Sequence, residues 1–491
     1  MNISYEKVFD RYFGLIDDVK ELSLKESDLH EILAERLHSA ISSPFIRRLF
    51  STLKLDDEME QFEFELTTSV DEYSDEEFVI ELFSKGMAIK WLEPKVKSLE
   101  NTVRFFGGKE EKKLKDDFSL NKALLKEMKI EPVVSIWPTI NPKSENYEEM
   151  NEANMLVRTE NGQYGTFEFY GQQTFIDVTH PKTGSFVWDK VKENYYKYGI
   201  RTFWLDEAEP EVHPQQYSNL KFYAGNGAQS AMLYPYYYSK MFYEGLKSEG
   251  ETDIILLTRA AYPGTQKFGS LVWNGDIMST FEALRMSVKT GLSMAMSGIP
   301  WWNSDIGGFL VGDIESDYFK ELVVRWAQFG VFSPVMRLHG SRLRTKNQKD
   351  RHPDVKERSG GDNEIWSFGE ENYKILKGLV ELRERLRPYI CHYMDLASET
   401  GAPIMRPMFF DYYEDEVCYT LEDQYMFGED ILFAPISAQG QTGREVYLPE
   451  GSWIDVNTKE VYEGKKWVTC TAQLHQFIAF VREGSNVINV F

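Results

Sequence analysis

The sequence predicts an α/β protein whose parallel sheet is of the (β/α)8 barrel type, followed by an all-β region. Between about residues 116 and 340, short β-rich runs alternate with segments of helical periodicity, as βα units do. After residue 396 the pattern changes to short strands and turns, and before residue 106 it is acidic and mainly helical. We therefore divide the chain into residues 1–105, 106–396 and 397–491.

Six apolar runs in the central region predict strands: Pro132–Ile140, Thr202–Leu205, Asp253–Thr258, Leu271–Asn274, Gly298–Asn303 and Val331–Arg337. Six strands with helices between them fit six of the eight strands of a barrel, and a doubly wound sheet is the alternative. Residues 141–175 are longer than a βα loop needs, so we expect an excursion over the active face.

The intervening helices are predicted from their apolar spacing. Residues 187–198 keep a helical period before Gly199, a typical C-terminal stop. Ser279 and Glu282 have the spacing of a capping box that begins the next helix. A long amphipathic helix is predicted over about residues 370–396, and it ends the central region.

The first hundred residues are different in kind. Residues 51–82 hold twelve Asp or Glu and one Lys, between helical segments predicted at 17–41 and 78–106. Within the acidic run, Phe62–Leu66 alternates like a half-exposed strand. We interpret the acidic run as a solvated face in preference to a specific binding site.

Composition narrows the classes of partner. The 491 residues carry a formal net charge of −23, which opposes binding to nucleic acid phosphates and to anionic membranes. Cys391, Cys418 and Cys470 form neither a disulfide framework nor a zinc motif. The N-terminus lacks a signal-peptide pattern and no run approaches eighteen apolar residues, so we expect a cytoplasmic protein that can form homo-oligomers.

Two carboxylates follow two separate predicted strands. Asp206 comes directly after Thr202–Leu205, and Asp276 follows Leu271–Asn274. A pair of carboxyl groups facing each other is what the cleavage of a glycosidic bond requires. Each alone can also be a structural acid, and residues 207–211 add three glutamates that would raise the pKa of the most buried group. For Asp276, the neighbouring Trp273 predicts an apolar setting that raises the pKa, as a general acid needs.

Three further polar residues occupy equivalent strand ends: Arg259, Asp305 and His339. A barrel delivers its reactive side chains at the C-terminal ends of its strands, so five such residues together favour an active site. Individually, each has a structural interpretation: an ion-pair partner, a turn residue and a hydrogen-bonded core histidine, respectively.

Four ordered motifs carry a resemblance to a known family: Trp204-Leu-Asp-Glu-Ala-Glu-Pro-Glu211, Trp273-Asn-Gly-Asp-Ile277, Ser297-Gly-Ile-Pro-Trp-Trp-Asn-Ser-Asp-Ile-Gly-Gly-Phe309 and Arg337-Leu-His-Gly340. They resemble the successive motifs of glycoside hydrolase family 31, and weaker similarity covers about residues 116–491. That family holds retaining α-glycosidases on a (β/α)8 barrel. The resemblance implies that Asp206 is the nucleophile and Asp276 the acid/base. The resemblance also implies that the cleaved sugar is bound in a pocket lined by Arg259, Trp273, Asp305 and His339. Further candidates for this pocket are Trp204, Trp137 and Phe169 or Tyr170.

The form of the first motif is similar to the α-xylosidase-like branch of the family. The implied activity is hydrolysis of terminal α-xylosides, without metal or organic cofactor, and α-glucosidase or transglycosylase activity is the alternative within the family. One hydroxymethyl group separates the two sugars, and a pocket discriminates such a group by only about 1–3 kcal/mol.

The resemblance does not extend over the whole chain. Residues 1–105 show no likeness to the family, and the first two strands of the barrel are not found. Three explanations remain open: the N-terminal segment covers the open edges, another chain covers them, or the chain is a truncated or rearranged product. A non-catalytic carbohydrate-binding or assembly protein is therefore the rival hypothesis.

Overall fold

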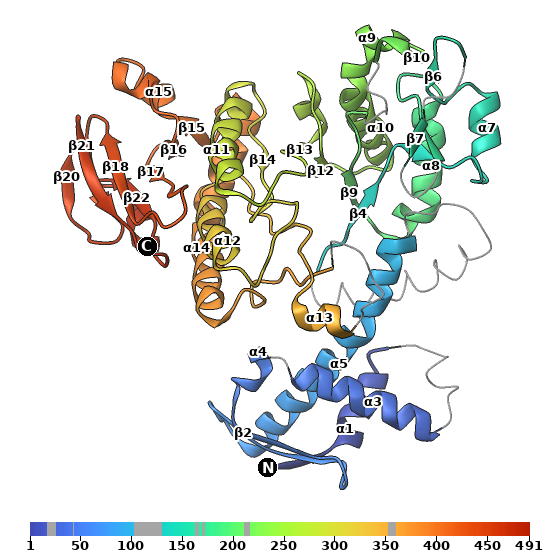
Figure 1. Cartoon of the computed structure of the whole chain (residues 1–491), viewed down its shortest axis with the longest axis vertical. Coiled ribbons are helices and arrows are strands. Elements are labelled where there is room, and N and C mark those ends of the chain that lie inside the picture. The colour runs from blue at the N-terminus through green and yellow to red at the C-terminus, as the bar shows by residue number, and fades with distance from the viewer. Residues whose placement is uncertain are drawn as a thin grey trace.

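The computed structural model describes residues 1–16, 26–42, 44–102, 130–162, 166–168, 172–210, 217–351 and 360–491. Its centre is a parallel sheet of five strands in the order β14-β13-β12-β9-β4 (Figure 1). The bounds of these strands are β4 Val133–Ile136, β9 Thr202–Leu205, β12 Leu256–Thr258, β13 Ser270–Trp273 and β14 Trp302–Asn303. All five lie within or next to runs that the sequence predicts as strands, and β9 has the predicted bounds.

Three predicted strands differ from the structure. The run 132–140 is split at Pro138, so that β4 pairs with β9 whereas β5, Thr139–Ile140, pairs with β8, Gln172–Phe175. The run 298–303 is a strand only at its end, because Gly298 adopts a positive φ of 75° and Pro300 has no N–H to donate to a ladder.

The prediction of a strand at Val331–Arg337 is wrong. Helix α12, Asp317–Val331, continues to its first residue, and the later part of the run forms only an isolated parallel bridge between Asp305 and Arg337. Phe329, Val331 and Phe332 are fully buried. The helix ends just before Ser333 and Pro334, and a proline can neither continue the helix nor donate an N–H to a strand ladder.

The helices identify the sheet as part of a barrel wall. Helices α8, Thr183–Asn194, and α10, Tyr234–Ser248, pack on Phe203, Leu205 and Leu256, which share one apolar cluster with them. Farther along the sheet, α11, Phe281–Met296, packs with Val272 in a second cluster. The side chains of Trp204 and Trp273 alternate with these residues along the strands, and they contact each other. One face thus carries the helices and the other is the interior, unlike a doubly wound sheet.

Helix boundaries were predicted with small errors. Gly199 has the positive φ of 84° expected of a stop, although α8 itself ends at Asn194 and a 3-10 turn, η1 Tyr196–Tyr198, intervenes. The start of α11 is one residue later than predicted, because the Thr280 side chain, rather than that of Ser279, accepts a hydrogen bond from the Ala283 N–H.

The excursion after β5 contains ordered elements of its own: α7 Tyr147–Glu152, β6 Arg158–Thr159, β7 Thr166–Glu168 and β8. Strand β8 lies between β5 and β7 in a small antiparallel sheet, and β6 pairs with β10, Leu220–Phe222. The long helix α14, Glu370–Thr400, precedes the C-terminal β region, as predicted.

The C-terminal region is all-β in its regular structure apart from short helical turns. A six-stranded sheet in the order β15-β16-β17-β22-β19-β20 lies beside the pair β18-β21. The bounds are β15 Met405–Pro407, β16 Tyr425–Phe427, β17 Ile431–Ala434, β18 Gly443–Leu448, β19 Ser452–Asp455, β20 Val461–Glu463, β21 Lys466–Thr471 and β22 Ile478–Arg482. Residues of β16, β17 and β22 share a core with α11, α12 and α14, so this region packs directly on the helices of the barrel.

The N-terminal unit has a separate core. Its strands are β1 Asn2–Ser4, β2 Phe50–Asp56 and β3 Gln61–Leu66, and its helices are α1 Tyr5–Phe13, α3 Glu26–Ile41, α4 Pro44–Arg47 and α5 Glu72–Thr102. Strand β3 covers the strand predicted at 62–66. The unit lies at one end of the molecule, where the Arg48 guanidinium contacts the Glu370 carboxylate and stacks on the Tyr373 ring (Figure 1).

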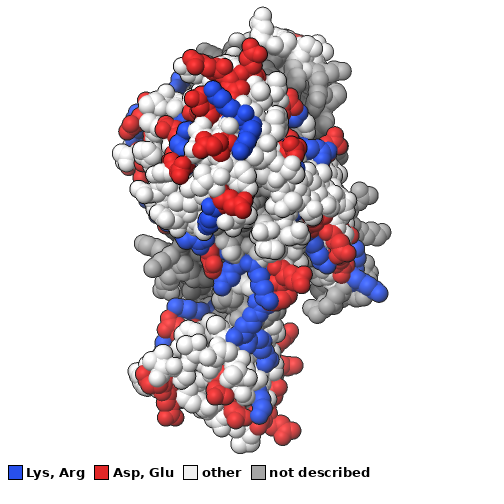
Figure 2. All heavy atoms as spheres, turned by 90° about the vertical axis from the view of Figure 1, so that its left-hand side faces the viewer, with Lys and Arg blue, Asp and Glu red and all other residues white. Residues whose placement is uncertain are grey.

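Charge is mixed on one face of the molecule. On the face seen in Figure 2, Lys and Arg side chains are interspersed with Asp and Glu over the upper part of the molecule. In the part of the chain that the structure describes, no helix combines the length and the apolar character that crossing a membrane requires.

Candidate active site

Asp206 is fixed at the end of β9. Its Oδ2 accepts a hydrogen bond from the Trp137 indole N–H at 3.2 Å, and its Oδ1 accepts from the Glu207 backbone N–H at 3.0 Å. Its side chain is 14% exposed. Glu207 has a positive φ of 54°, which is uncommon for a residue other than glycine and turns the chain sharply after the strand. Both oxygens of Asp206 are therefore oriented by the protein.

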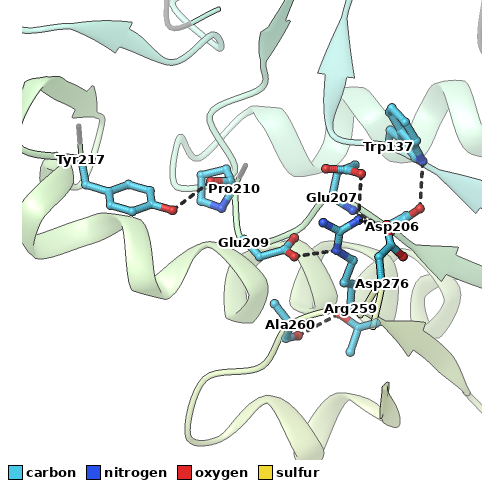
Figure 3. A network of polar contacts seen from close by, with 10 residues as sticks. Trp137, Asp206, Glu207, Glu209, Pro210, Tyr217, Arg259, Ala260 and Asp276 are labelled. Carbon is cyan, nitrogen blue, oxygen red and sulfur yellow. Dashed lines mark hydrogen bonds and ion pairs between the residues drawn. The ribbon is translucent and has the colours of Figure 1, made fainter. Parts of the chain in front are cut away.

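Arg259, at the end of the neighbouring strand β12, contacts the carboxylates of the site (Figure 3). Its Nε donates to Glu209 Oε1 at 2.6 Å, and its Nη1 donates to Glu207 Oε1 at 2.9 Å. The same Nη1 lies 3.5 Å from Asp206 Oδ1 and 3.6 Å from Asp276 Oδ2. One guanidinium group thus contacts four carboxylates that come from two different strand ends.

Burial and charge act in opposite directions here. Burial raises the pKa of the Asp206 carboxyl, and Arg259 and the hydrogen bonds only partly counteract it. The pKa of Glu209 is raised for the same first reason. Burial alone would lower the pKa of Arg259, but the carboxylates of Glu209, Glu207, Asp206 and Asp276 outweigh it, and the net pKa lies above its ordinary value. The guanidinium is therefore permanently charged.

Asp276 follows β13 and the positive-φ residue Gly275. Its side chain is 42% exposed, so the closely packed apolar setting predicted from Trp273 is not found. Asp276, Arg259 and Glu209 instead line a cavity of about 880 Å³ that continues along α11 past Met286. An open carboxyl group beside a cavity can reach a group that enters from solvent.

Asp305, after β14, is fully buried and forms an ion pair with Arg337. Burial raises the pKa of Asp305 to about 6, with Arg337 opposing and the negative charges of Asp276 and Asp206 contributing. Its Oδ2 has no hydrogen-bond partner among the described residues. A buried carboxylate oxygen without a partner is costly unless a ligand supplies the donor.

Aromatic rings line the same interior. Trp204 packs edge-on against Trp273 at a centroid distance of 5.6 Å and against His339 at 5.0 Å. The Arg337 guanidinium lies 4.7 Å from the Trp204 ring centroid and 5.3 Å from that of Trp273. Burial lowers the pKa of His339 to about 3, and the positive charges of Arg337 and Arg342 add to the effect. His339 is therefore neutral at physiological pH.

Most of the predicted site residues are brought together. The contacts above join Asp206 to Trp137, Arg259 to both Asp206 and Asp276, and Trp204 to Trp273 and His339, whereas Asp305 is connected to the aromatic rings through Arg337. Phe169, Tyr170 and Glu211 lie outside the described residues. Sequence reasoning assigned no role to Arg337, although it stands two residues before His339.

Arg342 was also missed. It is fully buried, and it donates to the carbonyl oxygens of Gly308, Ile306 and His339 at 2.7 to 3.2 Å. These bonds hold together the two segments that present Asp305 and His339. A charged residue in the turn-rich stretch after residue 339 gives no sequence signal for such a position. Within the described ranges, no group of three or more His, Cys, Asp or Glu side chains is arranged to hold a metal ion.

Comparison with known proteins gives consistent matches. The α-xylosidase of Saccharolobus solfataricus is 30% identical over 358 residues, which are 72% of this chain and 45% of the relative. Alpha-xylosidase A of Aspergillus niger is 31% identical over 396 residues, with 71% and 52% covered. The crystal structure of a family 31 α-xylosidase from a soil metagenome, complexed with xylose, superimposes with a TM-score of 0.72 at 47% identity and covers 76% of this chain and 56% of that one. The chain spans about half the length of these relatives.

Family models match most of the chain. The TIM-barrel domain of glycosyl hydrolases family 31 matches residues 63–393, and the C-terminal domain of the same family matches residues 401–487. The first match begins at residue 63, so the likeness extends farther toward the N-terminus than the sequence analysis found. The barrel wall, the C-terminal β region and the carboxylates at the strand ends agree with these matches, and the chain belongs to glycosyl hydrolase family 31.

Proposed function

We propose that this chain is a retaining glycosidase that hydrolyses terminal α-linked sugar residues, with α-xylosides as preferred substrates. The observation that carries the proposal is the convergence of Asp206 and Asp276, from the ends of two strands, on a single nitrogen of Arg259 at 3.5 and 3.6 Å. Because both oxygens contact the same atom, their separation is no greater than the sum of these distances. That limit is compatible with the ~5–5.5 Å separation of the two carboxyl groups in retaining enzymes, which supports the proposal.

The two carboxyl groups have different surroundings, which supports different roles. Asp206 is 14% exposed and held by Trp137 and the Glu207 N–H, as suits a fixed nucleophile that attacks C1 of the sugar. Asp276 is 42% exposed beside the cavity, so it can protonate the oxygen of the departing group. In the second step Asp276 takes a proton from water, water oxygen attacks C1, and the bond to Asp206 breaks, which releases the sugar with its α configuration.

The preference for xylose rests on the relatives. Two of those compared are named α-xylosidases, and the soil-metagenome structure holds xylose. Other relatives are named alpha-glucosidase 2, sulfoquinovosidase and isomaltosyltransferase, so the family resemblance alone covers several sugars and also transfer reactions. We therefore rank α-xyloside hydrolysis first and α-glucoside hydrolysis or transfer second.

The first test compares hydrolysis of 4-nitrophenyl α-xyloside and α-glucoside by the wild type and by Asp206→Ala. We expect turnover of the xyloside with the higher kcat/KM and a loss of at least about 10⁴-fold in the variant, because the covalent step has no substitute nucleophile. Proton NMR of the first product should show the α anomer. A β anomer formed first contradicts the retaining mechanism.

The roles of the two carboxyl groups are separated by azide. In Asp206→Gly, azide can occupy the vacated position and attack C1 directly, which gives the β-glycosyl azide. In Asp276→Ala, azide attacks the glycosyl-enzyme and gives the α-glycosyl azide. The opposite pairing of products reverses the assignment.

A carbohydrate-binding protein without catalysis is the second candidate, because the sheet has five strands among the described residues and a closed barrel has eight. Folded protein that binds xylose by calorimetry but turns over neither substrate favours this candidate. Turnover that disappears in Asp206→Ala excludes it.

A further inference from the structure

We propose that Glu207 and Glu209 are positioning residues for the reaction. Together they hold the Arg259 guanidinium in place and offset its positive charge, so that it can lie beside both Asp206 and Asp276 without fully compensating the negative charge of either carboxylate. This inference rests on the proposed function and deepens it. It assigns a role to two carboxylates that are neither nucleophile nor acid/base.

The distances divide the four carboxylates into two pairs. Glu209 at 2.6 Å and Glu207 at 2.9 Å lie within the range of strong N–H···O hydrogen bonds, whereas Asp206 at 3.5 Å and Asp276 at 3.6 Å lie beyond it (Figure 3). The glutamates therefore fix the guanidinium. The two aspartates lie farther from the guanidinium and experience its positive charge at longer range.

Local geometry explains how neighbouring residues reach one guanidinium. In an extended strand, the side chains of positions 206 and 207 would point to opposite faces. The positive φ of Glu207 breaks this alternation, and both side chains contact Arg259 Nη1. This conformation is strained for a residue other than glycine, and such strain is concentrated at functional sites.

Burial makes the pairing necessary. The side chains of Glu207 and Arg259 are 8% and 11% exposed, and an unpaired buried charge is strongly unfavourable. A single carboxylate would balance the positive charge of the guanidinium. Among the described residues, however, two glutamates contact it in addition to Asp206 and Asp276. The second glutamate must therefore be explained by something other than neutralisation.

The balance of charge supplies that explanation. Asp276 faces Arg259 together with Asp206, Glu207 and Glu209, and the charges of the Asp305–Arg337 pair also interact with it, whereas His339 is neutral. When Asp276 carries its proton, three other carboxylates of the described residues surround Arg259, and the summed charge of these four groups is negative. Negative charge opposes loss of the proton from Asp276, as its role of acid requires. Removing the charge of Glu209 should therefore lower the pKa of both Asp276 and Asp206.

Glu209→Gln tests the proposal, because the glutamine Oε1 still accepts from Arg259 Nε while the charge is lost. We expect both limbs of the pH profile of kcat/KM to move to lower pH by ~0.5–1 unit, with less than about a tenfold loss at the optimum. Glu209→Ala removes the anchor as well, and it should cost about 10²-fold in kcat/KM. The matched control is Glu244→Gln on the exposed side of α10, whose profile should equal that of the wild type.

A direct titration separates this proposal from the proposed function. Asp206 and Asp276 are followed by ¹³C NMR in protein labelled at aspartate Cγ, with Asp206→Asn and Asp276→Asn for assignment, in wild type and Glu209→Gln. Lower pKa values of both groups in Glu209→Gln support the role of Glu209, whether or not an α-glycoside is turned over. Unchanged pKa values and an unchanged pH profile overturn it and leave Glu209 as a structural ion-pair partner, whereas inactivity of the wild type toward α-glycosides contradicts only the proposed function.

Discussion

At the scale of single residues, His339 links the pocket to acid stability. Its ring makes a T-shaped contact with Trp204 and stacks on Phe309, and its pKa is lowered to about 3. An unfolded histidine has a pKa of about 6.5, so the unfolded state binds a proton first as the pH falls. The free energy of unfolding is therefore unaffected by protonation of His339 well above pH 6.5, and it decreases progressively as the pH falls from 6.5 toward 3. At pH 5 the loss amounts to about 2 kcal/mol.

We expect His339→Gln to remove this part of the pH dependence, because glutamine does not titrate. Urea unfolding at pH 7 and pH 5, followed by tryptophan fluorescence, measures it. The wild type should lose about 2 kcal/mol more than the variant between the two pH values. Equal losses in both proteins mean that His339 does not titrate differently in the folded and unfolded states.

The site shows what residue patterns can predict. Asp206, Arg259, Asp276 and Asp305 were chosen because each follows an apolar run, and the structure places them after parallel strands that meet at one edge of a sheet. His339 was chosen in the same way, although the run before it forms no strand. Arg342 and the exposure of Asp276 were not found. Both depend on how distant segments pack against one another, and nothing in the neighbouring residues records that packing.

At the scale of elements, two neighbouring hydroxyl groups at the N-terminus of α11 differ in their hydrogen bonding. Thr280 caps the helix by accepting from the Ala283 N–H at 3.1 Å, whereas the Ser279 hydroxyl is buried without a partner among the described residues. We expect Thr280→Ala to destabilise the protein by about 1 kcal/mol. Ser279→Ala should be neutral or slightly stabilising, because it removes a buried polar group that lacks a hydrogen bond.

Chemical denaturation of the two variants measures this difference. If Ser279→Ala lowers the free energy of unfolding as much as Thr280→Ala does, or more, then Ser279 is the N-cap, as the capping-box pattern predicts. Since α11 begins five residues after Asp276, Thr280→Ala should also lower kcat/KM slightly more than Ser279→Ala does.

Element prediction succeeded where the pattern had one physical solution. Thr202–Leu205 is bounded by Gly199 and by the acidic turn, and the strand has those bounds. The run after Phe329 had two solutions, because a fully apolar segment can be buried as a helix or as a strand. The structure takes neither in full: α12 ends at Val331, Ser333 and Pro334 follow, and Arg337 forms only an isolated bridge.

At the scale of the whole molecule, the barrel helices and the C-terminal region are joined by hydrogen bonds and by a shared apolar core. Arg325 of α12 is buried, and its guanidinium donates to four backbone carbonyls of the C-terminal region, those of Gln441, Ala472, Gln473 and Gln476. No carboxylate hydrogen-bonds to it among the described residues, so its bonds depend on the position of those loops. The shared apolar cluster adds to this connection.

The N-terminal unit, in contrast, has its own cluster of buried residues between Ile3 and Trp91. Its described ion pair with the rest of the chain, Arg48 with Glu370, is half-exposed, and such pairs contribute ~0–1 kcal/mol. We therefore expect the unit to unfold independently. Phe83→Ala, in the core of the unit, should lower its stability by about 3–5 kcal/mol and leave the catalytic rate unchanged.

Differential scanning calorimetry of Phe83→Ala and Leu322→Ala measures this independence. Leu322 is fully buried in the cluster that α12 shares with the C-terminal sheet, so its truncation should shift the other transition and reduce activity on heating. Two transitions, each moved by only one of the variants, are the expected result. A single transition that both variants lower would mean that residues 1–102 stabilise the barrel cooperatively, and the N-terminal unit would then be part of the structure that supports the site.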